Sequence, residues 1–351
     1  MQLEIRQVNS SDKALWNAYV ESHPQASAYH AFAWVESVEQ AYGHPNASLI
    51  ALKDKQVVGV LPISKMLKPF VGHSFCSLPF CDIGYALSDN DETTSVLLEH
   101  LQKLKTDTGA KKIEYRDSEH IDSQQKVDTT DLKGKKVRML LSLPDTSDIL
   151  LKSFKSKLRS QIRKAEKNGL TYQIGNSTEL LNAFYQVFKY NMRKLGSPVH
   201  GFDWFKTLQK NYQENFILSV VYYENTPVGG GIVLRNGVKT CIPWASTLAE
   251  YNRLAPNMML YWSLLKEVSD SGAKEFDFGR STFGEGTFKF KEQWGAQPVA
   301  LNWELPGQQT TQATNQTGPG NLRSLVEKSW SKLPIDMTTT LGPKIRKYIS
   351  L

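Results

Sequence analysis

The chain has 351 residues, of which 40% are apolar and 22% charged, and its formal net charge is +7. This length accommodates two domains of ordinary size, and the composition excludes disordered and collagen-like chains. Three cysteines, Cys76, Cys81 and Cys241, are too few for a disulfide framework, so we expect free thiols and a reducing compartment. The positive charge favours a polyanionic partner such as tRNA, a nucleotide-linked sugar or an anionic membrane face.

The amino-terminal residues predict neither a signal peptide nor a membrane anchor. Met1 to Ser11 contains Glu4 and Arg6 among its apolar residues. No window of the chain approaches the roughly 18 uncharged apolar residues that span a bilayer. We therefore expect a cytoplasmic protein, with the inner face of the membrane as a second place of action.

The first half predicts a β-hairpin, a helix and a further strand. Leu49–Leu61 has two apolar runs on either side of a polar turn that begins at Asp54. An amphipathic helix runs from about Thr93 to Thr108 and ends at Gly109, and an alternating segment then leads to Arg116.

The second half repeats these elements in the same order. Leu218–Ile232 predicts the hairpin, with Glu224 in its turn, and a helix from about Asn257 to Ser271 ends at Gly272. An alternating segment again leads to an arginine, Arg280. The recurrence predicts a tandem duplication of one α/β unit with a mixed sheet.

The repeat divides the chain into a first domain, residues 1–144, and a second, residues 145–305. Lys136–Leu143 is expected to be the last strand of the first domain, and Pro298–Glu304 that of the second. Residues 306–351 are expected to form a linker and a short helical appendage.

Within that tail, Pro306–Asn321 is polar and of low complexity, as in flexible linkers. It leads to an amphipathic helix at Leu322–Leu333 and then to a basic segment ending at Leu351. The basic residues of this segment are Lys344, Arg346 and Lys347. They offer either a peripheral contact to an anionic membrane or a simple cap on the domain.

A strongly basic helix is predicted over Ser156–Asn168, with Leu158 and Ile162 on its apolar stripe. Its basic side chains are Lys157, Arg159, Arg163, Lys164 and Lys167. Arg159, Arg163 and Lys167 are the candidates for binding phosphates, as in tRNA. The alternative is an ordinary solvated face.

This helix and the motifs after it resemble the FemAB family of peptidyltransferases. The matching segments of the second half are Arg159, Ile162–Lys167, Gly169–Leu170, Phe276–Ser281, Gly286–Phe288 and Phe290–Ala296. The first half matches more loosely, through Leu78–Phe80 and Gly84. The tail segments Trp330–Ile335 and Leu341–Pro343 are similar to the ending of the subgroup linked to PEP-CTERM/exosortase exopolysaccharide systems. The resemblance implies α/β architecture with two tandem GNAT-like acyltransferase domains.

The resemblance also implies a reaction. Known members transfer an aminoacyl group from aminoacyl-tRNA to an amine of a peptidoglycan precursor. We expect an acyltransferase that modifies a nucleotide- or lipid-linked glycan or peptide of the cell envelope, peptidoglycan or exopolysaccharide. Such transfer requires a stabilised oxyanion, a protonated leaving group and a deprotonated attacking amine. It requires no metal and no cofactor beyond the donor, aminoacyl-tRNA or acyl-CoA.

Lys291 is the first candidate catalytic residue, because Phe290-Lys291 matches a Phe-Lys pair that is implicated in catalysis in the family, with Phe290 in substrate binding. The alternative is a surface lysine on a strand or turn. Arg280 is a candidate for holding a carboxylate or phosphate. Its counterpart Arg116 raises the alternative of a structural ion pair in both halves. Asp277 is a candidate base, or an ordinary acid on a strand.

Three aromatic residues, Trp244, Tyr223 and Trp294, are candidates to line an acceptor groove. The alternative for each is a place in the core, which is more common for aromatic residues in strands. Gly229–Gly231 lies within a predicted strand, where glycines permit close approach, and is interpreted as the floor of the groove.

Arg253 and Asn257, before the second-half helix, are candidates for binding an anion of the substrate. The glycine-rich turn that cradles the pyrophosphate of acyl-CoA in GNAT enzymes is missing from Asn252–Asn257, which disfavours acyl-CoA. An acyl-CoA-dependent N- or O-acetyltransferase of an exopolysaccharide unit remains an alternative. A non-enzymatic scaffold that binds polyanions through the basic helix is another.

Overall fold

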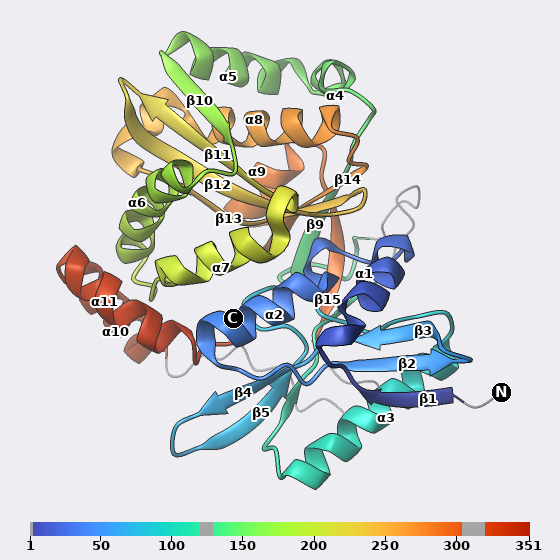
Figure 1. The fold of residues 1–351 in the computed structure, drawn as a ribbon. Coiled ribbons are helices and arrows are strands. Elements are labelled where there is room, and N and C mark those ends of the chain that lie inside the picture. Colours follow the sequence, from blue (N-terminus) through green and yellow to red (C-terminus); the bar gives the residue numbers. More distant parts are fainter. Residues whose placement is uncertain (1–2, 120–128, 304–319) are drawn as a thin grey trace.

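The computed structural model describes residues 3–119, 129–303 and 320–351. Figure 1 shows two α/β halves, one above the other, with the carboxy-terminal helices along one side. Both halves combine helices with sheets that contain parallel and antiparallel pairs, so the predicted α/β class with mixed sheets is confirmed. The three cysteines are buried and free, as expected.

The first half contains two sheets, with strand orders β1-β2-β3-β6 and β4-β5-β7. Its strands are β1 (Leu3–Gln7), β2 (Leu49–Lys53), β3 (Gln56–Leu61), β4 (Ser64–Lys68), β5 (Gly72–Cys76), β6 (Leu87–Ser88) and β7 (Ile113–Glu114). Its helices are α1 (Lys13–Ser22), α2 (Phe32–Tyr42) and α3 (Asp91–Thr108). The predicted hairpin is β2–β3, with positive φ at Asp54 and Lys55 in its turn.

The second half is built on one sheet with strand order β10-β11-β12-β13-β14-β9-β15-β8. Its strands are β8 (Asp117–Ser118), β9 (Lys136–Ser142), β10 (Leu170–Gly175), β11 (Phe216–Tyr223), β12 (Thr226–Asn236), β13 (Lys239–Thr247), β14 (Glu275–Thr282) and β15 (Gln297–Asn302). Its helices are α4 (Ser147–Ser153), α5 (Ser156–Lys167), α6 (Thr178–Lys194), α7 (Phe202–Tyr212), α8 (Pro256–Asp270) and α9 (Gly286–Glu292).

The two halves share a strand–helix–strand unit. In the first half β5 and β7 are parallel neighbours and α3 lies between them in the chain. In the second half β13 and β14 are parallel neighbours, separated by α8. Left-handed glycines follow both helices, Gly109 at φ +67° and Gly272 at φ +86°. The elements that the sequence predicted as repeats are therefore equivalent in space as well as in order.

The position of β9 corrects the predicted end of the first domain. This strand pairs with β14 on one side and β15 on the other, within the sheet of the second half. Its side chains Val137, Met139 and Leu141 belong to the core of that half. Both edges and one face of β9 are thus satisfied by elements of the second half, so residues 136–142 do not close the first.

A second correction concerns Gly229–Gly231, which is buried beneath helices and does not form the floor of a groove. A Cβ atom on Gly230 would meet Phe184 of α6 at 3.1 Å, and one on Gly231 would meet Leu264 of α8 at 3.2 Å. The glycines let these helices approach the sheet from both faces.

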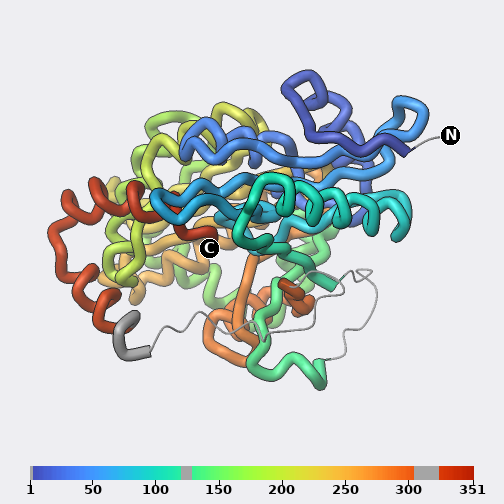
Figure 2. Tube along the Cα trace, turned by 90° about the horizontal axis from the view of Figure 1, so that it is seen from below, coloured from blue at the N-terminus to red at the C-terminus, as the bar shows by residue number. Residues whose placement is uncertain are grey.

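The carboxy-terminal segment contains α10 (Gly320–Lys332) and α11 (Ile335–Arg346), both packed against α6. Figure 2 shows these helices at the edge of the molecule and the chain end turned back toward the first half. There the amide of Phe80 donates to the carbonyl oxygen of Ser350 at 2.6 Å. The linker predicted over Pro306–Asn321 lies, apart from its last two residues, outside the described residues.

Candidate functional site

Lys291 lies on α9 with only 8% of its surface exposed. Its Nζ atom donates to the carbonyl oxygens of Gly279 (3.0 Å) and Arg280 (2.8 Å). The surface lysine on a strand or turn, which was the alternative from the sequence, is therefore wrong. An ammonium has three N–H donors, so among the described residues one donor is left over for another acceptor.

A bulge in β14 aims these two carbonyl groups at Lys291. The pairing of β14 with β9 shifts register between Asp277 and Arg280, and Gly279 has a left-handed φ of +72°. The amide of Gly279 donates to Asp277 Oδ1 at 2.8 Å, which holds the bulge. In a regular strand successive carbonyls point in opposite directions, so the bulge is what makes the pair of acceptors.

Asp277 is buried and forms an ion pair with Arg138 of β9, with Nη2 and Oδ2 2.9 Å apart. Burial opposes the charge of Arg138, but attraction to Asp277 raises the pKa of Arg138 above its usual value. The carboxylate thus has a guanidinium and a backbone amide as partners. It supports the bulge and is not the isolated acid on a polar strand face that the sequence indicated.

The pKa of Lys291 is about 8, lowered from its ordinary value chiefly by burial. The negative charges of Asp82 and Asp277 oppose this shift, and the positive charge of Arg280 adds to it. At neutral pH the amine is therefore mostly protonated, yet it exchanges its proton far more readily than a surface lysine.

Arg280 contacts the first half of the chain through Asp82. Its amide donates to Asp82 Oδ2 at 3.1 Å, and its Nε atom lies 3.4 Å from Asp82 Oδ1. Its guanidinium carbon also lies 5.1 Å from the centroid of the Trp303 ring. Arg116 pairs with Glu114 at 3.4 Å and reaches the same ring at 5.6 Å. Both arginines thus form ion pairs, as the structural alternative predicted, and both meet Trp303.

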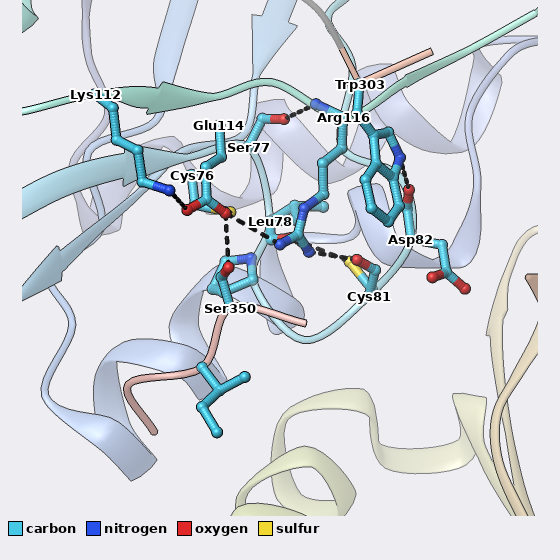
Figure 3. Close-up of polar contacts among 12 residues, drawn as sticks. Cys76, Ser77, Leu78, Cys81, Asp82, Lys112, Glu114, Arg116, Trp303 and Ser350 are labelled. Carbon is cyan, nitrogen blue, oxygen red and sulfur yellow. Dashed lines mark hydrogen bonds and ion pairs between the residues drawn. The ribbon is translucent and has the colours of Figure 1, made fainter. Parts of the chain in front are cut away.

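Arg116 also organises the loop that carries Asp82, as Figure 3 shows. Its guanidinium donates to the carbonyl oxygens of Leu78 and Cys81, and its amide donates to Ser77 Oγ. Leu78 and Phe80 have left-handed φ values of +69°, which are uncommon for such side chains. The contacts of Arg116 hold this strained loop in place.

The aromatic candidates divide between core and cluster. Trp294 is fully buried, so for this residue the core alternative is confirmed. Trp244 is partly buried and stacks on Trp34 with ring centroids 6.0 Å apart. Tyr223 lies at the end of β11 beside Tyr251, at 6.1 Å. Phe290 packs edge-on against Tyr261 and near Trp294, one side chain away from Lys291 in the chain.

The anion-binding candidates lie on other elements. Arg253 and Asn257 are exposed before and at the start of α8, where Asn257 accepts a hydrogen bond from Thr247 at 3.2 Å. On α5, Arg163 and Lys167 are exposed. Arg159 instead donates to the carbonyl oxygens of Lys152 and Phe154, and so caps the end of α4.

The structure therefore brings Lys291, Arg280 and Asp277 together, and adds three residues that the sequence did not single out. These are Asp82, Arg138 and Trp303. The only signal for Asp82 was its place between the Leu78–Phe80 and Gly84 motif positions. We call the group of Lys291, Arg280, Asp82, Asp277 and Arg138 the junction site, because it joins both halves.

Comparisons with known proteins agree with this architecture. Residues 152–292 match the family model of the acetyltransferase (GNAT) domain, a stretch that runs from α4 to α9. No curated protein sequence matches the chain.

Several solved structures share the fold. FemX superimposes with a TM-score of 0.67 at 15% identity, covering 92% of this chain and 100% of FemX. The carboxy-terminal domain of a putative lysylphosphatidylglycerol synthetase from Agrobacterium fabrum gives 0.52 at 12% identity, covering 84% and 91%. A tandem GNAT protein of the clavulanic acid pathway gives 0.50 at 10%, covering 86% and 97%. The predicted fold of two tandem GNAT-like domains is thus confirmed.

Proposed function

We propose that the protein is an acyltransferase that transfers an aminoacyl or other acyl group to an amine or hydroxyl of a cell-envelope precursor. The observation that carries this proposal is the buried ammonium of Lys291, held by two carbonyls within the region that matches the GNAT domain. The structural likeness to FemX and to a lysylphosphatidylglycerol synthetase domain supports a peptidoglycan or lipid-linked acceptor.

The chemistry follows from the position of that ammonium. The acceptor nitrogen or oxygen attacks the acyl carbonyl carbon, forming the new C–N or C–O bond. The carbonyl oxygen becomes an oxyanion, and the donor bond to oxygen or sulfur then breaks while a proton passes from the acceptor to the leaving group. The remaining N–H of Lys291 stabilises the oxyanion or the donor phosphates. Because the ammonium is already desolvated and fixed, little reorganisation is needed when charge develops.

Arg280 and Asp82 set the geometry of this group. Arg280 supplies one of the two carbonyls that hold Lys291, and Asp82 fixes the amide of the same residue. Both are therefore positioning residues. The acceptor, in this proposal, lies toward the aromatic side chains of Phe290 and Trp244, and the donor lies over the second half.

An acyl-CoA donor is a second candidate, favoured by the match of residues 152–292 to an acetyltransferase domain. The pyrophosphate would then bind at the start of α8, where Ala255 has φ +64° and Arg253 is exposed. An aminoacyl-tRNA donor would use the exposed Arg163 and Lys167 of α5 instead.

The test is single-turnover transfer from aminoacyl-tRNA and from acetyl-CoA, with a cell-envelope extract as the acceptor pool. Transfer that falls by about 100-fold or more in Lys291→Ala supports the proposal. Lys289→Ala is the matched control, since Lys289 is exposed on the same helix. Binding of polyanions without transfer from either donor would contradict it and identify a scaffold.

A further inference from the structure

Large exposed apolar side chains are concentrated in two parts of the molecule. Nine of the fifteen found in the described residues lie in the segments 67–71 and 325–349. The first segment is the tip of the β4–β5 hairpin, where Phe70 is fully exposed beside Leu67 and Val71. Phe70 also has a left-handed φ of +60°, which is unfavourable for an aromatic side chain. Neither packing nor backbone preference explains an aromatic residue here.

The second part is the outer face of α11. Met337, Leu341 and Ile345 are spaced four residues apart and are all exposed, so they form one apolar stripe along the helix. The inner face instead carries Thr338 and Gly342, which are buried. The usual distribution of apolar and polar residues is thus reversed, because the small inner residues permit close packing and the large apolar ones face outward.

A basic cavity of about 490 Å³ lies between the hairpin and the end of the chain. Its cationic lining comes from Lys65, Lys68 and Lys347, and no Asp or Glu is among its described lining residues. His44 joins its two sides: its Nδ1 accepts from the amide of Leu67 at 3.2 Å, and its Nε2 lies 2.7 Å from the carbonyl oxygen of Lys347. Hairpin tip, cavity and chain end are therefore one continuous surface.

We infer that this surface, the hairpin tip with the cavity and the α11 stripe, docks onto an anionic phospholipid membrane. Phe70, Val71 and the stripe enter the boundary between headgroups and acyl chains, and the cavity lysines receive lipid phosphates. Figure 1 shows the tip of β4–β5 and the α10–α11 segment on the same side of the molecule.

Charge complementarity favours a lipid surface over an apolar protein partner. The segment 324–351 has five basic side chains (Lys328, Lys332, Lys344, Arg346 and Lys347) and two acidic ones (Glu327 and Asp336). Apolar side chains surrounded by cations are typical of interfacial membrane anchors. Within the described residues no helix has the length and apolar character to cross a bilayer, so the contact we infer is peripheral. It goes beyond the proposed function, since it concerns where the enzyme works.

The test is flotation of the full chain with vesicles of phosphatidylcholine alone or mixed with phosphatidylglycerol. We expect binding to the anionic vesicles only, weakened by salt. Lys65→Glu with Lys68→Glu should weaken this binding on the order of 30-fold or more, from the attraction of two surface lysines. Phe70→Ser with Val71→Ser should abolish it. Lys103→Glu and Val238→Ser, at exposed positions elsewhere, should bind like the wild type.

Three results would overturn the inference. These are no binding to anionic vesicles, equal binding to neutral and anionic vesicles, and unchanged binding of the Phe70 and Lys65 variants. Self-association of the wild type that Phe70→Ser abolishes, without vesicle binding, would assign the surface to a second copy of the chain. Flotation needs no acyl donor, so Lys291→Ala should still bind, and failure of the proposed function would be seen separately.

Discussion

Asp82 and Arg280 connect the two halves of the chain within the junction site, the carboxylate accepting the amide of Arg280 at 3.1 Å. Because the carbonyl of Arg280 holds Lys291, we expect Asp82→Ala to displace the ammonium. Displacements of this kind cost up to about 100-fold in rate, so kcat/KM should fall by about 10- to 100-fold. The measurement is steady-state transfer with whichever donor proves active.

The conservative variant separates positioning from charge. Asp82→Asn keeps an oxygen acceptor for the amide of Arg280 and should recover part of the lost rate. Asp145→Ala removes an exposed carboxylate and should be silent. Equal rates for Asp82→Ala and the wild type would show that the junction does not position Lys291.

The pH dependence of transfer should report Lys291. Since its pKa is about 8, the stabilising ammonium is present below that pH and is lost as the pH rises through it. We expect kcat/KM to decrease above pH about 8, approaching tenfold per pH unit. Lys291→Arg should lose this decrease, because a guanidinium stays charged, although its overall rate will be lower. An unchanged alkaline limb in that variant would assign the titration to another group.

The Arg138–Asp277 ion pair should matter for stability chiefly when it is broken on one side. Arg138→Met leaves a buried carboxylate without its partner, and urea unfolding should show a loss of about 3–5 kcal/mol. Arg138→Met combined with Asp277→Leu should lose less, since neither charge then remains buried. The exposed pair Lys274–Asp145 is the control, and Lys274→Met should unfold like the wild type.

Gly84→Ala should disrupt the loop that carries Asp82. A Cβ atom at this position would lie 1.9 Å from the carbonyl oxygen of Ser77, a backbone atom that cannot turn away. We expect a loss of roughly 3 kcal/mol in thermal or urea unfolding. At Gly286 a Cβ atom would meet nothing within 4 Å, so Gly286→Ala should leave stability nearly unchanged. A stable Gly84→Ala protein would mean that the loop relaxes easily.

The elements that could be predicted from the sequence are those determined by local signals. The β2–β3 and β11–β12 hairpins and the helices α3 and α8 follow from periodicity, turn residues and terminal glycines, and their limits agree within two or three residues. Lys291 and Arg280 were found through the motif they share with FemAB proteins. Local signals and motifs are contained in short stretches of sequence.

The features that were missed depend on distant partners. Nothing in Lys136–Ser142 itself tells that its neighbours are β14 and β15 of the other half. Arg138 looks like an ordinary charged residue until the chain brings Asp277, 139 positions later, beside it. In the same way the exposed stripe of α11 has the periodicity of a buried face, so only the structure reveals that it points outward.

The docking of the last residues also constrains how the protein matures. Ser350 Oγ donates to Glu114, 236 residues earlier in the chain, and its carbonyl accepts from Phe80. During synthesis the amino-terminal half is made first, but the loop around Phe80 lacks this partner until the ribosome has completed nearly the whole chain. The first half must therefore wait for the tail, so a nascent chain stalled before residue 350 should carry an unfinished junction site.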